Sequence, residues 1–210
     1  MEFHCVTRSA GQGEDGGPLL ILLHGYGSNE EDLLGLMSHL DPRLMGVGIR
    51  APFPLDWGGH AWFPIEMTEA GLQLDFSQAL EICQLLGDEI DRIRNKQGAE
   101  RVFILGFSQG ASMALGVALG RPLLAAGVVG MSGLCVEEML PADRTQVQGL
   151  PILLTHGRQD PVIPIHQGRS SRDLLAGLPV ALSYREYDMG HEVGADCLDT
   201  VDQWVRQRLD

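Results

Sequence analysis

The stretch Val102-Phe103-Ile104-Leu105-Gly106-Phe107-Ser108-Gln109-Gly110 decides the fold class of this chain. Its first four residues are apolar, which predicts a buried strand, and helix-forming residues follow Gly110. A serine on a sharp turn between strand and helix needs nearly bare neighbours two positions before and after it, and Gly106 and Gly110 meet that need. The hydroxyl of Ser108 is then held above the end of a sheet, which predicts a nucleophilic serine.

The pentapeptide from Gly106 to Gly110 also fits a second interpretation, a glycine-rich loop whose serine has no chemical role. Glycine is frequent in this chain, with 27 among 210 residues, so the pattern can arise by chance. A serine hydroxyl is a poor nucleophile at neutral pH and needs a base, which a carboxylate orients. The partners of Ser108 therefore decide between the two interpretations.

Two such partners follow later apolar runs of the chain. Asp160 comes shortly after one run and His191 shortly after the next. Because the carboxyl ends of parallel strands meet at one edge of a sheet, we expect both side chains to approach Ser108 there. The chain order Ser, Asp, His is the one expected for an α/β-hydrolase. Asp188 is the alternative carboxylate, but it is too near to His191 in sequence to orient it from an opposing loop.

Backbone donors for a developing negative charge are expected on two turns. Gln109 follows Ser108 at the start of the predicted helix, where the helix dipole is positive. The turn His24-Gly25-Tyr26-Gly27 follows the apolar run Leu19–Leu23, and its glycines let the backbone approach a substrate. The sequence therefore predicts an oxyanion hole formed by the N–H groups of Tyr26 and Gln109.

Six apolar runs alternate with longer helix-like stretches, the pattern of parallel strands joined by helical crossovers. The runs are Leu19–Leu23, Val47–Ile49, Val102–Leu105, Ala125–Val129, Ile152–Leu154 and Ala181–Tyr184. We therefore predict an α/β fold with a mainly parallel, doubly wound sheet flanked by helices, in a single domain over residues 1–210 without a large lid domain. Helices are expected from about Asp75 to Asn95, after the capping-box spacing Ser28–Glu31, and at the C-terminal end.

The segment from Pro52 to about Leu72 is too long and too aromatic for a plain connection. Loops longer than roughly 12–15 residues in a compact domain tend to be functional, and Trp62 and Phe63 suit an apolar substrate pocket. Met131, which follows the fourth apolar run, is expected to border the same pocket. A satellite apolar cluster over the edge of the sheet is the alternative for the 52–72 segment.

Composition and charge narrow the class of partners. The net charge is −13 without an offsetting cluster of Lys or Arg, so we expect no nucleic-acid partner. No apolar stretch approaches the roughly 20 residues that span a bilayer, and Met1–His4 lacks the features of a targeting signal, so we expect a cytoplasmic chain without stable membrane insertion. Reduced thiols and no bound metal are expected because four cysteines lack metal-ligand or disulfide-framework spacing: Cys5, Cys83, Cys135 and Cys197.

Several motifs occur together along the chain, namely His24-Gly25-Tyr26-Gly27, Trp62-Phe63, Gly106-Phe107-Ser108-Gln109-Gly110, Met131-Ser132-Gly133, His156-Gly157 with Asp160, and Gly190-His191. As a set they resemble the phospholipase/carboxylesterase family, which includes acyl-protein thioesterases and small bacterial carboxylesterases. The resemblance runs from about Leu19 to Trp204. Family members commonly carry an aspartate after the Trp-Phe pair, where this chain has Pro64, and this departure bears on the shape of the substrate loop but not on the triad.

The resemblance implies a compact α/β-hydrolase with Ser108, Asp160 and His191 as catalytic triad and the amides of Tyr26 and Gln109 as oxyanion hole. The expected function is a serine esterase that cleaves short or medium acyl esters through an acyl-enzyme intermediate, without a metal or organic cofactor. Its partner is then a small-molecule acyl ester or thioester, and a homodimer is compatible with the sequence. Two alternatives stay open: acyl-protein thioesterase or lysophospholipase activity, and a ligand-binding protein on a hydrolase fold with little turnover.

Overall fold

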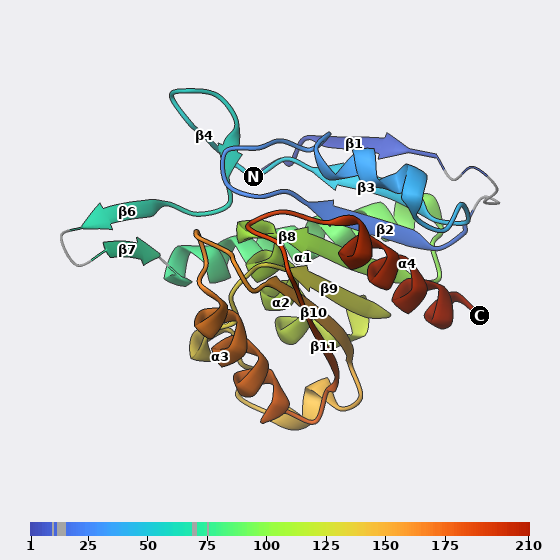
Figure 1. Cartoon of the computed structure of the whole chain (residues 1–210). Helices are drawn as coiled ribbons and strands as arrows, with labels where there is room; N and C mark the ends of the chain where they lie inside the picture. The colour runs from blue at the N-terminus through green and yellow to red at the C-terminus, as the bar shows by residue number, and fades with distance from the viewer. Residues whose placement is uncertain (10, 12–15, 69–70, 75) are drawn as a thin grey trace.

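The computed structural model of the chain describes residues 1–9, 11, 16–68, 71–74 and 76–210. Its centre is a seven-stranded sheet in the order β1-β3-β2-β8-β9-β10-β11 (Figure 1). Strand β1 runs antiparallel to β3, and every other neighbouring pair in this sheet is parallel. The strands are β1 (Cys5–Arg8), β2 (Leu19–Leu23), β3 (Met45–Ile49), β8 (Val102–Phe107), β9 (Gly127–Met131), β10 (Pro151–Gly157) and β11 (Ala181–Tyr187). The predicted mainly parallel α/β fold is confirmed.

Alternate residues of the strands enter two separate apolar cores. In β2, Leu19, Ile21 and Leu23 belong to one core and Leu20 and Leu22 to the other, and each is at most 1% exposed. A sheet that is buried on both faces explains why these strands are apolar throughout instead of alternating with polar residues.

Helices cover both faces of the sheet. The first core contains the inward side chains of α1 (Phe76–Gln97), α2 (Gln109–Gly120) and α3 (Ile165–Ala176). The second contains those of the 3₁₀ helix η1 (Leu33–His39) and of α4 (Ala195–Leu209). Short 3₁₀ turns complete the connections: η2 (Pro122–Leu124), η3 (Glu137–Met139) and η4 (Arg144–Val147). Within the described residues, no helix is both long and apolar enough to cross a membrane.

The structure tests two of the predicted helix starts. The helix predicted from Asp75 is present from Phe76, and Asp75 itself lies outside the described residues. The capping box predicted at Ser28–Glu31 is wrong. Ser28 instead forms a bridge with His60 and donates to the carboxylate of Asp32 at 2.7 Å, so it lies on the preceding turn and caps no helix. The element that follows is the 3₁₀ helix η1, which has no side-chain cap.

The aromatic 52–72 segment forms two short antiparallel hairpins. The first pairs β4 (Phe53–Pro54) with β5 (His60–Ala61), and the second pairs β6 (Ile65–Thr68) with β7 (Gly71–Leu74). Residues 69–70 of this segment lie outside the described residues. Figure 1 shows the second hairpin extending away from the sheet. The hairpins belong to the crossover from β3 to α1, which places the aromatic residues near the carboxyl ends of the central strands.

Candidate active site

The carboxyl edge of the sheet brings together the three side chains predicted to form a triad. Ser108 directly follows β8, Asp160 lies on the loop after β10, and His191 lies on the loop after β11. Because β8, β9, β10 and β11 are parallel, all three loops leave the sheet at the same edge.

Ser108 lies on a strained turn. Its backbone angles are φ 55° and ψ −120°, a conformation that L-residues rarely adopt. A side chain at Gly106 would collide with the backbone carbonyl of Gly110, and one at Gly110 would collide with the carbonyl of Leu23. Both glycines are therefore required by close backbone approach, which is the reason that the sequence pattern supplies them.

The three side chains form one hydrogen-bonded chain. The Ser108 hydroxyl lies 2.9 Å from Nε2 of His191, and Nδ1 of His191 lies 2.7 Å from Oδ2 of Asp160. With Nδ1 donating to the carboxylate, Nε2 is free to accept the serine proton. The ring of Phe107 packs on the imidazole with centroids 4.9 Å apart, which helps to fix its orientation.

The Asp160 carboxylate is enclosed by its own loop. Its side chain is 0% exposed, and Oδ1 accepts the N–H groups of Val162 and Ile163, both at 2.8 Å. These bonds leave Oδ2 for His191. The alternative carboxylate, Asp188, is exposed and pairs with Arg158 at 2.8 Å instead.

His156 is a second histidine beside this carboxylate, and the sequence reasoning assigned it no role. Its imidazole is buried, with Nε2 2.8 Å from the carbonyl oxygen of Ile163 and 3.6 Å from Oδ2 of Asp160. It therefore braces the loop that carries Asp160. The available signal was the place of His156 beside Asp160 in the sequence, four residues before it and in the same motif.

The two predicted backbone donors lie on turns that face Ser108. Gln109 is the first residue of α2, where backbone N–H groups have no acceptor within the helix. The turn that carries Tyr26 packs against the serine, because a side chain at Gly25 would lie 3.4 Å from Cβ of Ser108. The N–H of Gly27 donates to the carbonyl oxygen of His60 at 2.9 Å, which fixes the same turn to the 52–72 segment.

A cavity of about 690 Å³ opens beside Ser108. Most of its wall is apolar, and the exposed side chains of Trp57 and Val162 stand at its rim. The lining residues are Tyr26, Trp57, Phe63, Ile65, Ser108, Gln109, Ser112, Leu134, Val162, Ile163, Gln167 and His191. Its size and apolar wall are typical of small-molecule sites.

Two of the three side chains predicted to border this cavity lie elsewhere. Phe63 does line it, but Trp62 and Met131 are 0% exposed and are absent from its wall. Met131 ends β9 and points into the core beneath the sheet edge, and Trp62 turns inward to donate from Nε1 to the carbonyl of His24. Pro64, at the position of the family aspartate, is exposed and is not part of the cavity wall.

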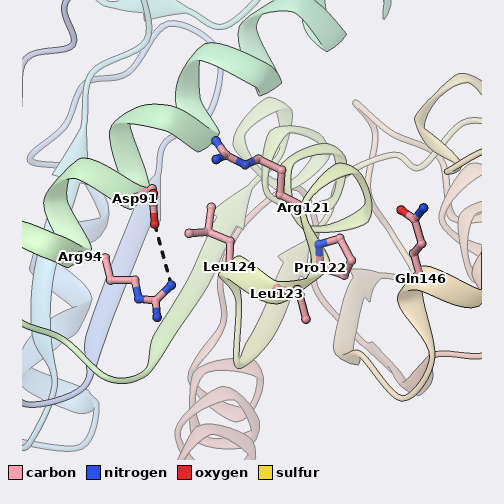
Figure 2. A pocket seen from close by; sticks show the side chains of 7 residues that line it. All are labelled: Asp91, Arg94, Arg121, Pro122, Leu123, Leu124 and Gln146. Carbon is pink, nitrogen blue, oxygen red and sulfur yellow. Dashed lines mark ion pairs between the residues drawn. The ribbon is translucent and has the colours of Figure 1, made fainter.

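A second cavity, of about 510 Å³, offers a contrast (Figure 2). It lies between α1, η2 and η4, next to the amino end of β9 and so away from Ser108. Its two arginines are engaged with aspartates: Arg94 with Asp91 at 3.8 Å, and Arg121 with Asp88 at 2.7 Å. No lining residue is a nucleophile with a base beside it, so the cavity at Ser108 is the candidate active site.

The cysteines and other metal-binding residue types show no competing site in the described part of the chain. All four cysteines are free, and burial raises the pKa of Cys83 and of Cys135 to about 12, so both stay protonated thiols at neutral pH. Among the described residues, no three His, Cys, Asp or Glu side chains are grouped as metal ligands would be.

A mainly parallel sheet with a serine at the strand–helix turn, and with aspartate and histidine on later loops, defines an α/β-hydrolase. Residues 10–209 match the sequence profile of the Phospholipase/Carboxylesterase family, and the chain belongs to this family of carboxylesterases and acyl-protein thioesterases.

Comparison with individual proteins supports both the family and the fold. Acyl-protein thioesterase 1 of Gibberella zeae is 31% identical over 182 residues, which cover 80% of this chain and 73% of that protein. A rice protein (Oryza sativa subsp. japonica), named a probable inactive carboxylesterase, is 30% identical over 156 residues. The aligned residues cover 71% of this chain and 63% of that protein. The solved carboxylesterase of Mesorhizobium loti has a TM-score of 0.84 at 21% identity, covering 97% of this chain and 94% of its own, and supports the fold alone.

Proposed function

We propose that this chain hydrolyses carboxylic esters of short or medium acyl chains, with Ser108 as nucleophile, His191 as general base and Asp160 as its orienting carboxylate. The observation that carries the proposal is the hydrogen-bonded chain from Ser108 to Asp160, with distances of 2.9 and 2.7 Å. Nucleophile, base and orienting group are thus within bonding reach of one another, as acyl transfer by serine requires.

The reaction proceeds in two halves. The Ser108 oxygen bonds to the acyl carbon as His191 takes its proton; the negative charge on the carbonyl oxygen is met by the N–H groups of Tyr26 and Gln109. Collapse breaks the bond to the leaving oxygen, which receives the proton from His191, and an acyl-serine remains. Water then adds to the acyl carbon by the same path, releasing the acid and restoring Ser108. Asp160 stabilises the imidazolium in both halves.

The cavity wall favours an acyl chain as the part of the substrate that is bound. Phe63, Ile65 and Leu134 give the cavity an apolar wall, and its volume of about 690 Å³ lies in the range of small-molecule sites. A thioester would pass through the same steps with a thiol as leaving group, and one relative is named a thioesterase. Comparing kcat/KM for an ester and a thioester of the same acyl chain therefore identifies the preferred leaving group.

The test is hydrolysis of p-nitrophenyl esters from acetate to laurate, together with a butyryl thioester, by the native chain and by Ser108→Ala. We expect turnover by the native chain and a loss of several orders of magnitude in the variant. The ester chain length with the highest kcat/KM then measures the depth of the cavity. If the native chain is as inactive as the variant on every substrate, the esterase proposal fails and the ligand-binding alternative takes its place.

A further inference from the structure

The side chain of Gln109 makes contacts that its place after the nucleophile does not require. Gln109 is 5% exposed; its Oε1 accepts the N–H of Trp62 at 2.8 Å, and its Nε2 donates to the carbonyl of Phe63 at 2.7 Å. The amide therefore pairs with two consecutive residues of the aromatic segment, much as a neighbouring strand would. Both polar ends of a buried side chain are used, so removing the amide leaves two backbone groups unpaired.

The segment held by Gln109 is itself bonded to the other donor turn. Trp62 donates from Nε1 to the carbonyl of His24 at 2.8 Å, and its ring packs on the His24 imidazole with centroids 5.5 Å apart. His24 is the first residue of the turn His24-Gly25-Tyr26-Gly27, which carries Tyr26. A continuous set of hydrogen bonds between buried groups therefore connects the Gln109 side chain to the start of the Tyr26 turn.

His24 is held in a single tautomer at that point. Its Nε2 accepts the N–H of Ala51 at 3.0 Å and so carries no proton, while Nδ1 donates to the carbonyl of Gly25 at 2.7 Å. Burial lowers the pKa of His24, which keeps the imidazole neutral. The backbone just before Tyr26 is thus held at two successive carbonyls, those of His24 and Gly25.

From these contacts we infer that the Gln109 side chain is a positioning residue, which holds the backbone N–H groups of Tyr26 and Gln109 at a fixed separation by gripping residues 62–63 as a bridge. The inference rests on the proposed esterase function, because it assigns these two groups to the oxyanion. The two donors come from segments far apart in sequence, the turn after β2 and the start of α2.

Precise separation matters because oxyanion donors act at about 2.7–3.1 Å from the oxygen, and losing one costs on the order of 100 to 1,000-fold in kcat. Two other roles for the Gln109 amide predict different kinetics. If it only shapes the cavity through Phe63, its loss changes KM and the preferred chain length. If it only stabilises the fold, its loss lowers stability while the folded enzyme keeps its kcat.

The experiment compares Gln109→Met, Trp62→Phe and the double variant, all measured against p-nitrophenyl butyrate. Methionine keeps the length of the side chain without its hydrogen bonds, and Trp62→Phe removes the Nε1 donor at the far end of the bridge, on a side chain that does not line the cavity. Gln146→Met is the matched control, because Gln146 is an exposed glutamine beside the second cavity (Figure 2).

We expect Gln109→Met and Trp62→Phe each to lower kcat by about 10 to 100-fold with KM within about threefold of the native value. The inhibition constant of a medium-chain alkyl trifluoromethyl ketone, whose adduct with Ser108 places an oxyanion at the donors, should rise by the same factor. Because both variants break one bridge, the double variant should lose less than the product of the single losses. Gln146→Met should match the native chain.

Folding is measured by urea denaturation of every variant, and kcat is referred to folded protein. An unchanged kcat and ketone affinity in Gln109→Met, with Ser108-dependent turnover in the native chain, overturns this inference and leaves the esterase function standing. A change confined to KM or chain-length preference overturns it in favour of the cavity-shaping role. If the native chain shows no Ser108-dependent turnover, the esterase function fails and this inference fails with it.

Discussion

Ser108 and Ser132 occupy matching places on neighbouring strands. Ser108 follows β8 and Ser132 follows β9, with φ angles of 55° and 50° in the left-handed region. The N–H of Ser108 donates to the carbonyl oxygen of Met131 in β9 at 2.8 Å. The N–H of Ser132 donates to the carbonyl oxygen of Thr155 in β10 at 2.9 Å. The Ser108 hydroxyl lies 2.9 Å from Nε2 of His191, whereas the buried hydroxyl of Ser132 has no hydrogen-bond partner in the described part of the chain.

The difference separates backbone strain from reactivity. Both serines are strained because the chain turns sharply as it leaves a buried parallel strand, and a side chain at Gly133 would collide with Ala111 just as one at Gly106 would collide with Gly110. Ser132 is 0% exposed, while Ser108 is part of the cavity wall. A nucleophile therefore requires a base and an open path to the substrate, and a strained turn alone provides neither.

The largest predicted effect is the difference in kcat between the alanine variants of Ser108 and Ser132. Ser108→Ala should lower kcat for p-nitrophenyl butyrate by up to about a millionfold, because the whole triad depends on its nucleophile. Ser132→Ala should stay within about threefold of the native chain. Intact mass after treatment with a fluorophosphonate should show one adduct in the native chain and in Ser132→Ala, and none in Ser108→Ala. Equal losses in the two alanine variants would contradict the distinction.

A smaller loss should follow when Ser108 is kept and its base is left without a carboxylate. Asp160→Asn preserves shape but cannot stabilise an imidazolium and favours the wrong tautomer of His191, so kcat should fall by about 10,000-fold. Asp188→Asn is the matched control, since Asp188 is exposed and pairs with Arg158. It should retain native kcat, and a comparable fall in Asp188→Asn would contradict the assignment of the orienting role to Asp160.

The comparison also predicts a difference in stability. An unpaired buried hydroxyl costs about 1–3 kcal/mol, so Ser132→Ala should raise the free energy of unfolding by about 1 kcal/mol while leaving the strained turn in place. Urea denaturation at pH 7 measures the change. A loss of more than about 1 kcal/mol would show that the Ser132 hydroxyl is hydrogen-bonded after all.

The smallest effect concerns pH and the turn that faces Ser108. Burial lowers the pKa of His24 in the folded chain, so the imidazole binds a proton more readily in the unfolded chain. The contribution of His24 to the free energy of unfolding is therefore complete above about pH 6.5 and falls as the pH drops below that value. His24→Gln keeps an acceptor for the Ala51 N–H but does not titrate. The loss of unfolding free energy between about pH 7.5 and about pH 5.5 should therefore be smaller in the variant than in the native chain. An equal or larger loss in His24→Gln would refute this.

Most of the fold could be predicted because its signals are local. Buried parallel strands read as continuous apolar runs, and all six predicted strands are present, although β9 begins at Gly127 instead of Ala125. Strand β1 was missed because it is a short, partly exposed edge strand without an apolar run. The capping box predicted at Ser28–Glu31 was wrong because Ser28 pairs with His60, and this pairing depends on a segment distant in sequence.

The residues of the candidate site likewise divide into those whose position could be predicted from local sequence and those whose position could not. The positions of Ser108, Asp160 and His191 at strand ends were readable, since each follows a strand that the sequence marks. The inward turn of Trp62 and Met131 was not readable, because a residue at the end of a strand or hairpin faces the core or the cavity according to register and neighbouring segments. The grip of the Gln109 side chain on residues 62–63 had no signal in the sequence at all.

By itself, the sequence determined the strand–turn–helix around Ser108, the order of the three triad candidates and the mainly parallel sheet, because these depend on glycine's missing side chain and on runs of adjacent apolar residues. Only the tertiary structure decided which side chains meet: that His191 reaches Ser108 and Asp160, that Ser132 is left without a base, and that Gln109 bonds to the aromatic segment. Such contacts are set by how distant segments pack on a shared sheet, and directional hydrogen bonds of about 3 Å form only once that packing is complete.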